Sequence, residues 1–177
     1  ISKATIFQVK STNTIPEDAE FVSYGADAGY TNDPTVLVSV YKKDLNLYIK
    51  EHIYQTQMTT YDIANKWRQI GIQREPIYFD SAEPRLIEEL KRMGFNVRPS
   101  LKGSDSINAG IDLLKRFKLH IHEDSHNCLQ EFRNYKWQED RSGKLLNKPI
   151  DKNDHTIDSV RYATYSVLSK PKFGKYT

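Results

Sequence analysis

Three aspartates in this chain lie where their carboxylates could bind divalent metal ions together. Asp27 follows the strand-like run Phe21–Ala26, Asp80 follows Ile77–Phe79, and Asp158 lies in a segment with helical spacing near the end of the chain. The carboxyl ends of parallel strands meet at one edge of an α/β sheet, so we expect Asp27 and Asp80 to face each other. Carboxylate oxygens are ligands that Mg²⁺ and Mn²⁺ prefer.

This set of acids suits a pair of metal ions. Two divalent ions roughly 3.5–4 Å apart need several anionic ligands to overcome their mutual repulsion. One ion activates a water molecule, and the other stabilises the leaving oxygen of a phosphodiester. We therefore expect Asp27, Asp80 and Asp158 to be catalytic metal ligands for two Mg²⁺ or Mn²⁺ ions, with Asp27 touching both. For Asp27 taken alone, the alternative is the cap of a hairpin turn.

Other polar residues lie near Asp158. Asp154 and His155 precede it by four and three residues, which places all of them near one face of a helical turn. His155 is a candidate catalytic residue, either as a metal ligand or as a general base or supporting group beside the ligands. Asp154 could instead cap the helix, the usual role of an aspartate at its start. Glu131 could also reach the site, although pairing with a surface charge is its default role.

The composition is compatible with a single domain that contacts a polyanion. The chain has 177 residues, 38% of them hydrophobic, and a formal net charge of +3. No apolar run approaches the ~18 residues of a membrane helix, so we expect no membrane partner. The sequence has neither a phosphate-binding P-loop nor a G-x-S-x-G nucleophile elbow, which disfavours an ATPase or a serine hydrolase.

The hydrophobic patterns predict an α/β fold, with a mixed β-sheet flanked by helices and an added β-hairpin. Residues 1–20 have little periodicity and are expected to be a linker or entry segment, residues 21–170 the domain, and residues 171–177 a tail. From residue 21 to residue 99 the patterns predict the order βββαβαβ, beginning with an antiparallel meander. Helices are expected over 107–117, after Ser125 and over 155–168, and a polar hairpin over 136–149.

Basic residues in loops on either side of the acids are candidates for DNA contact. Contacts of this kind position the phosphate backbone without reading its sequence. Gly25 and Gly29 flank Asp27, and we expect them to let DNA approach closely. The basic candidates are Lys102, Arg141, Lys144 and Arg161.

Short motifs, in the order in which they occur, connect the chain to a known family. They are Gly25-Ala26-Asp27-Ala28-Gly29, Tyr78-Phe79-Asp80-Ser81-Ala82-Glu83-Pro84, Lys102-Gly103-Ser104 and Asp154-His155-Thr156-Ile157-Asp158. With the order of the elements, they resemble the ribonuclease H-like nuclease superfamily. Within it, the resemblance is closest to the C-terminal nuclease domain of the large terminase subunit of tailed phages, and it covers about residues 21 to 168.

The resemblance implies a metal-dependent endonuclease that cleaves concatemeric double-stranded phage DNA during genome packaging. It implies Asp27, Asp80 and Asp158 as the acidic triad and His155 as an accessory residue. Double-stranded DNA, the terminase ATPase domain, the small terminase subunit and the portal are the implied partners, and the cytoplasm of the infected or lysogenic bacterial host is the implied location. Because the chain begins with Ile and lacks a Walker motif, we expect an isolated nuclease domain. Its hairpin would match the family's β-hairpin near the DNA groove.

Two alternative functions are compatible with the same residues. A Holliday-junction resolvase or transposase-like nuclease of the same superfamily would prefer branched substrates over linear duplex. A non-catalytic module that binds DNA or the portal would use the acids only for a structural ion. Metal that raises the melting temperature without any cleavage would favour this second alternative.

Overall fold

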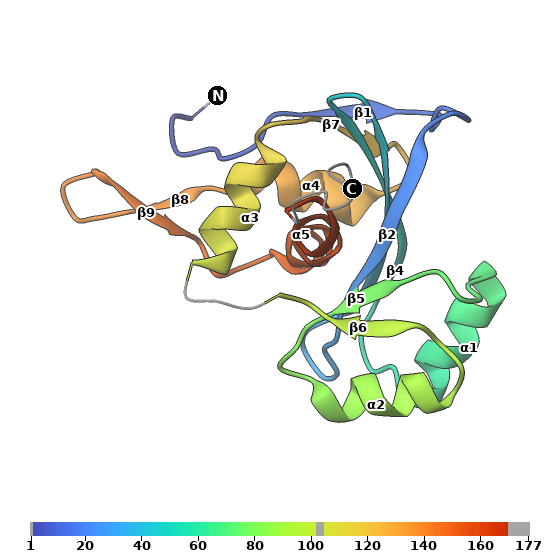
Figure 1. Ribbon diagram of the computed structural model, residues 1–177. Helices are drawn as coiled ribbons and strands as arrows, with labels where there is room; N and C mark the ends of the chain where they lie inside the picture. The colour runs from blue at the N-terminus through green and yellow to red at the C-terminus, as the bar shows by residue number, and fades with distance from the viewer. Residues whose placement is uncertain (1, 102–104, 170–177) are drawn as a thin grey trace, which may run out of the picture.

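A seven-stranded mixed β-sheet forms the centre of the protein (Figure 1). The computed structural model describes residues 2–101 and 105–169. The strands β2 (Glu20–Asp27), β3 (Thr35–Lys43) and β4 (Asn46–Gln55) form the expected antiparallel meander, and the other neighbouring strands of this sheet pair in parallel. The order across the sheet is β1 (Val9–Thr12), β7 (Lys118–His122), β4, β3, β2, β5 (Ile77–Phe79) and β6 (Val97–Pro99).

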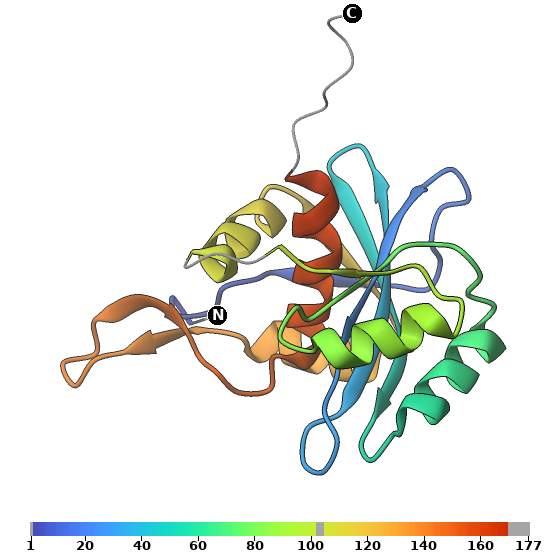
Figure 2. The same cartoon turned by 60° about the horizontal axis from the view of Figure 1, so that its bottom comes forward.

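Helices cover both faces of this sheet. Helices α1 (Thr60–Ile70) and α2 (Pro84–Arg92) pack on one face, and α3 (Ser106–Leu114), α4 (His126–Asn134) and α5 (His155–Leu168) pack on the other. Strands β8 (Trp137–Glu139) and β9 (Leu145–Pro149) form a separate hairpin, which projects from the body in both views (Figures 1 and 2). The expected α/β class, with a mixed sheet flanked by helices and an added hairpin, is confirmed.

The sheet separates two hydrophobic cores. Strand β3 contributes to both, because its side chains alternate between the faces. Val36, Val38 and Val40 join the core beneath α3, α4 and α5, whereas Leu37 joins the core beneath α1 and α2. This double burial explains why β3 is a nearly continuous β-branched run rather than an alternating one. It also makes the middle of the sheet a rigid base for groups at its edge.

The first twenty residues differ from the linker that we expected. Strand β1 pairs in parallel with β7, and Ile6 and Phe7 are buried in the core beneath α4 and α5. The ring of Phe7 lies 5.3 Å from that of Phe132, centroid to centroid. A short edge strand gives too few residues for a clear period of two, which is why the pattern was not recognised. The outer boundaries of the domain stay predictions, and the tail at 171–177 lies outside the described residues.

The helix starts follow the expected capping chemistry in part. Thr59 caps α1 in a capping box with Asp62, and Pro84 occupies the first turn of α2. Ser125 lies at the start of α4 but makes no side-chain cap, because its hydroxyl accepts a hydrogen bond from the Glu51 amide instead. Within residues 2–101 and 105–169, no helix is both long and apolar enough to cross a membrane.

Candidate metal centre and active site

Asp27 and Asp80 lie at the carboxyl ends of two neighbouring strands of the sheet. Asp27 is the last residue of β2, and Asp80 directly follows β5. The two strands are parallel neighbours, with Ala26 paired to Phe79 in register. The predicted parallel pairing of the two strands is therefore confirmed, and it places Asp27 and Asp80 at neighbouring carboxyl ends; the facing of their carboxylates stays a prediction.

A close approach of α5 to β2 brings the third acid to this edge. A Cβ atom added to Gly25 would lie 1.9 Å from the carbonyl oxygen of Ser159, so only glycine lets the helix backbone pack this closely. At Gly29, an added Cβ would lie 2.2 Å from the carbonyl oxygen of Asp33, inside the turn after β2. The two glycines therefore allow the packing of α5 and a tight turn; the expected approach of DNA at these positions stays a prediction.

His155, the first residue of α5, forms ion pairs with two aspartates from other parts of the chain. Its Nδ1 lies 3.5 Å from Oδ2 of Asp27, and its Nε2 lies 3.5 Å from Oδ1 of Asp33. Hydrogen bonding to Asp27 raises the pKa of His155 to about 9, although partial burial opposes the shift. Burial also raises the pKa of Asp27, and the nearby Asp80 raises it further, while His155 lowers it. At neutral pH the imidazolium therefore balances part of the negative charge of the site.

Asp158 lies one helical turn after His155 and is paired with a different cation. Its Oδ1 lies 3.2 Å from Nη2 of Arg161. Burial, followed by the charge of Asp154, raises the pKa of Asp158 to about 7, against the opposing effect of Arg161. A second cation of higher charge would stabilise the ionised form of a carboxylate that burial disfavours in this way. Asp154 immediately precedes α5 but makes no side-chain cap, so its expected capping role is not seen.

The charges of all three acids affect the hydroxyl of Tyr162. Burial raises the pKa of its hydroxyl, and the next contributions come from Asp158, Asp27 and Asp80. Like charges gathered around one point repel each other unless cations lie between them. The electrostatics of the site are thus those of an acidic cluster partly neutralised by His155 and Arg161.

The donor set fits a hard divalent ion in its chemistry, since carboxylate oxygens come from β2, the end of β5 and α5. In the described part of the chain, however, no group of three His, Cys, Asp or Glu side chains is arranged to hold a metal ion. The ion pairs give a physical reason, because Asp27 is turned onto His155 and Asp158 onto Arg161. Metal binding would have to compete with these two cations. The assignment of the ligands stays a prediction.

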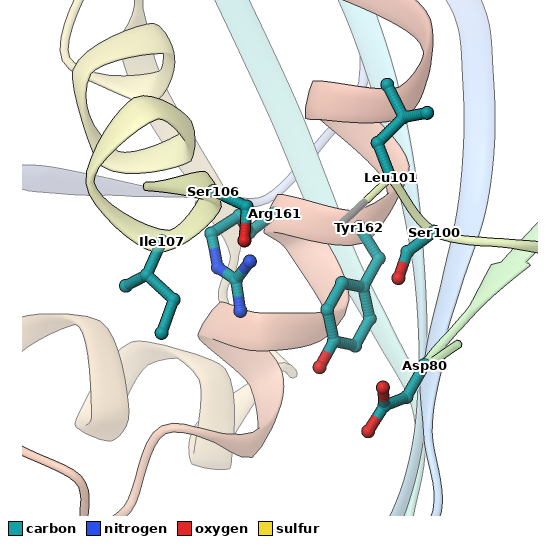
Figure 3. Close-up of a pocket in the computed structure, with 7 residues that line it drawn as sticks. All are labelled: Asp80, Ser100, Leu101, Ser106, Ile107, Arg161 and Tyr162. Carbon is teal, nitrogen blue, oxygen red and sulfur yellow. The ribbon is translucent and has the colours of Figure 1, made fainter. Parts of the chain in front are cut away.

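A cavity of about 470 Å³ opens beside Asp80 (Figure 3). Tyr162 and Arg161 enter it from α5, and Leu101 lines it from the segment after β6. Leu101 and Ile107 remain 43% and 45% exposed, which leaves apolar surface next to the acidic edge. The remaining lining residues are Ser100 and Ser106.

The basic candidates for DNA contact lie in different environments. Arg161 lies in α5 rather than in a loop, is 6% exposed, and packs its side chain against Gly110 of α3. Arg141 and Lys144 are exposed at the tip of the hairpin. The carboxylate of Asp140 accepts hydrogen bonds from the Lys144 amide and from Ser142, which fixes this tip. Lys102 lies outside the described residues.

Sequence reasoning missed the roles of two acids. No site role was predicted for Asp33, yet it pairs with His155. Glu131 was expected to pair at the surface, yet it is 4% exposed and hydrogen-bonds the start of α5. A signal for Glu131 was present: it lies three residues after Cys128 and four before Tyr135, on the apolar face of α4. A carboxylate on such a face needs hydrogen-bonding partners in the core.

Solved nuclease domains of large terminases share this fold. The nuclease domain of the large terminase from bacteriophage SPP1, solved with bound Mn, has a TM-score of 0.76 at 24% identity, covering 91% of this chain and 97% of that one. The large terminase nuclease from thermophilic phage G20c, solved with bound magnesium, has a TM-score of 0.66 at 17% identity, covering 92% and 97%. At these identities, the likeness establishes the fold.

The sequence itself establishes the family. The family model described as the terminase RNase H-like domain matches residues 27–165, so the chain belongs to this family. The large terminase subunit of Bacillus phage SPP1 is 30% identical over 148 residues, which are 80% of this chain and 35% of that protein. The PBSX phage terminase large subunit of Bacillus subtilis is 28% identical over 142 residues, 78% and 33% respectively. The chain thus spans about a third of these curated relatives, and the resemblance noted in the sequence is confirmed.

Proposed function

We propose that this chain is a metal-dependent endonuclease domain that cleaves concatemeric double-stranded phage DNA during genome packaging. The observation that carries the proposal is the parallel pairing of β2 with β5, which end next to Asp27 and Asp80. We infer that α5 brings Asp158 near them, because the charges of all three acids act on Tyr162 of the same helix. Membership of the terminase RNase H-like family supports the nuclease role. The relatives from SPP1 and G20c, solved with Mn and with magnesium, support a divalent ion.

In this proposal, Asp27, Asp80 and Asp158 bind two Mg²⁺ or Mn²⁺ ions, and Asp27 contacts both. Ions held there would supply an activated water and would stabilise the leaving oxygen of a phosphodiester. The rigid pairing of β2 with β5 fixes the spacing of Asp27 and Asp80. His155 holds a proton between Asp27 and Asp33 and keeps the Asp27 carboxylate oriented before metal arrives. Arg161 keeps the Asp158 carboxylate oriented through its ion pair.

Positive charge near the acidic edge would position the DNA. Arg141 and Lys144 extend on the hairpin, where they can reach phosphates at a distance from the acids. Arg161 is directed instead into the cavity beside Asp80, where it can meet a phosphate next to the cleaved bond. Lys102 is included with them on the basis of the sequence alone.

The remaining parts of the proposal follow from the family. A terminase ATPase domain, the small terminase subunit and the portal would be the protein partners, and the host cytoplasm would be the place of action. A tethered motor would raise the local concentration of DNA at the nuclease, so the isolated domain would cleave slowly.

Incubation of supercoiled plasmid with the chain and Mn²⁺ tests the proposal. We expect nicking by the wild type and its loss in Asp27→Asn, Asp80→Ala and Asp158→Ala, each shown to be folded by circular dichroism. Asp18→Ala is the matched control, because this exposed carboxylate precedes β2, at the end of the strand opposite Asp27. Nicking retained in folded Asp80→Ala and Asp158→Ala would refute the proposal.

A further inference from the structure

Glu131 is a buried carboxylate on α4 with three hydrogen bonds. Its Oε1 accepts from the amide and the hydroxyl of Thr156, at 2.7 and 2.6 Å. Its Oε2 accepts from the hydroxyl of Tyr54 on β4, at 2.7 Å. Hydrogen bonds to an ionised group are shorter and stronger than neutral ones, and here they hold a side chain that is only 4% exposed. One carboxylate therefore joins α4, β4 and α5.

The bonds to Thr156 act as the N-terminal cap of α5. Thr156 is the second residue of this helix, where the backbone amides have no partner within the helix. Asp154, which immediately precedes the helix, makes no side-chain cap. Glu131 supplies the missing acceptor from a neighbouring helix, and its negative charge lies at the positive end of the helix dipole.

The turn that Glu131 caps is the one that carries the candidate active-site residues. His155 precedes Thr156, and Asp158 follows it by two positions. Further along α5, the contact between Gly25 and the Ser159 backbone sets the distance of the helix from β2. The Gly25 contact fixes the separation of helix and strand, and the Glu131 bonds fix the position of the first turn along and around the helix axis.

We propose that Glu131 is a positioning residue, which holds the first turn of α5 so that His155 and Asp158 meet Asp27. The proposal rests on the function proposed above, in which Asp158 and Asp27 bind metal together. It extends that function to a residue that touches neither the metal nor DNA. Groups that orient metal ligands in this way typically change metal affinity by about 10- to 100-fold when they are removed.

Titration of the 177-residue chain with Mn²⁺ by calorimetry tests this role. Glu131→Ala should weaken Mn²⁺ binding by at least about 10-fold. Glu131→Gln should stay within about threefold of the wild type, because its amide oxygen still accepts from Thr156 and its amide nitrogen can donate to the Tyr54 hydroxyl. Thr59→Ala is the matched control: it removes the cap of α1, on the opposite face of the sheet, and should lower the melting temperature by about 2–4 °C without changing Mn²⁺ affinity.

Amide hydrogen exchange without metal gives an independent readout. Exchange should accelerate in the peptide that contains Thr156 in Glu131→Ala, but not in Thr59→Ala. Wild-type protein that fails to bind Mn²⁺ would contradict the proposed function, while unchanged exchange in Glu131→Ala would contradict the positioning role itself. The two failures are therefore distinguishable.

Other results would also overturn the inference. A folded Glu131→Ala variant whose Mn²⁺ affinity lies within about twofold of the wild-type affinity would contradict the positioning role, since removal of an orienting group has a larger effect. Equal losses in the alanine and glutamine variants would do so too, because the acceptor for Thr156 would then be irrelevant. If Glu131→Ala does not fold, Tyr54→Phe removes one donor to Glu131 and keeps the ring. It should weaken Mn²⁺ binding by about threefold or more, and unchanged affinity would contradict the role.

Discussion

Replacement of Gly25 by alanine tests the contact that brings α5 to the end of β2. The added Cβ would lie 1.9 Å from the carbonyl oxygen of Ser159 and 2.8 Å from its carbonyl carbon. Since carbon and oxygen atoms ordinarily approach to roughly 3.3 Å, the helix would have to retreat by about 1 Å or more. No side-chain rotation can relieve the overlap, because both atoms of Ser159 belong to the backbone.

The size of the effect follows from this overlap. Inserting a methyl group into a well-packed interior typically costs about 1–3 kcal/mol, and a clash with backbone on both sides belongs at the upper end. For a domain of this length, a loss of about 3 kcal/mol corresponds to a melting temperature lower by about 6–12 °C. A misplacement of about 1 Å can reduce the rate of a positioned reaction roughly 100-fold, so we expect a similar loss of nicking as Asp158 moves from Asp27.

Urea unfolding and plasmid nicking measure the two effects, with Gly71→Ala as the control. Gly71 ends α1 with a φ of 99°, and a Cβ there would have no atom within 4 Å. Its replacement should cost about 1–2 kcal/mol of backbone strain and leave nicking unchanged. Gly25→Ala with wild-type stability and full nicking would refute the argument that a glycine is needed for this helix–strand contact.

The charges of the site and of the hairpin give three further expected outcomes. The raised pKa of Asp158 makes its ionisation in the native state costly, so the metal-free wild type should lose stability between pH 4 and pH 7. The unfolding free energy of Asp158→Asn should therefore rise relative to that of the wild type by on the order of 1–3 kcal/mol over this range. A difference between the two proteins that does not change with pH in urea titrations would contradict this. His155→Ala should lower the melting temperature of the metal-free chain most below pH 6.5. This loss should vanish as pH rises through about 9, because the imidazolium of the folded state deprotonates there. An equal loss at pH 6 and pH 10 would exclude the ion pair. Arg141→Ala and Lys144→Ala should keep the wild-type melting temperature, while each lowers the salt dependence of DNA binding, measured by fluorescence anisotropy, by about one unit of slope; unchanged slopes would remove the hairpin from the DNA interface.

The sequence is informative where local patterns and topology agree. The meander of β2, β3 and β4 follows from β-branched runs between short turns, and the pairing of β2 with β5 follows from the intervening helix. Asp27 and Asp80 each end such a strand, so their proximity could be predicted without coordinates. The helix with His155 and Asp158 was also predicted over the observed residues, because its apolar period is regular.

Contacts between elements distant in the chain could not be predicted in the same way. The need for glycine at position 25 arises from the backbone of Ser159, which lies 134 positions later in the sequence. Glu131 caps a helix other than its own, and Ser125 gives up its expected cap to bond the Glu51 amide. Such choices depend on how helices pack against the sheet, and the local capping preferences are overridden by that packing.

Anomalous diffraction from a crystal soaked in Mn²⁺ would show whether Asp27, Asp80 and Asp158 form a metal centre. The proposal predicts anomalous density between the three carboxylates, with Asp27 turned from His155 and Asp158 turned from Arg161 toward the ions. Absence of density at this edge of the sheet in a fully soaked crystal, or Mn²⁺ bound elsewhere with both ion pairs intact, would contradict it.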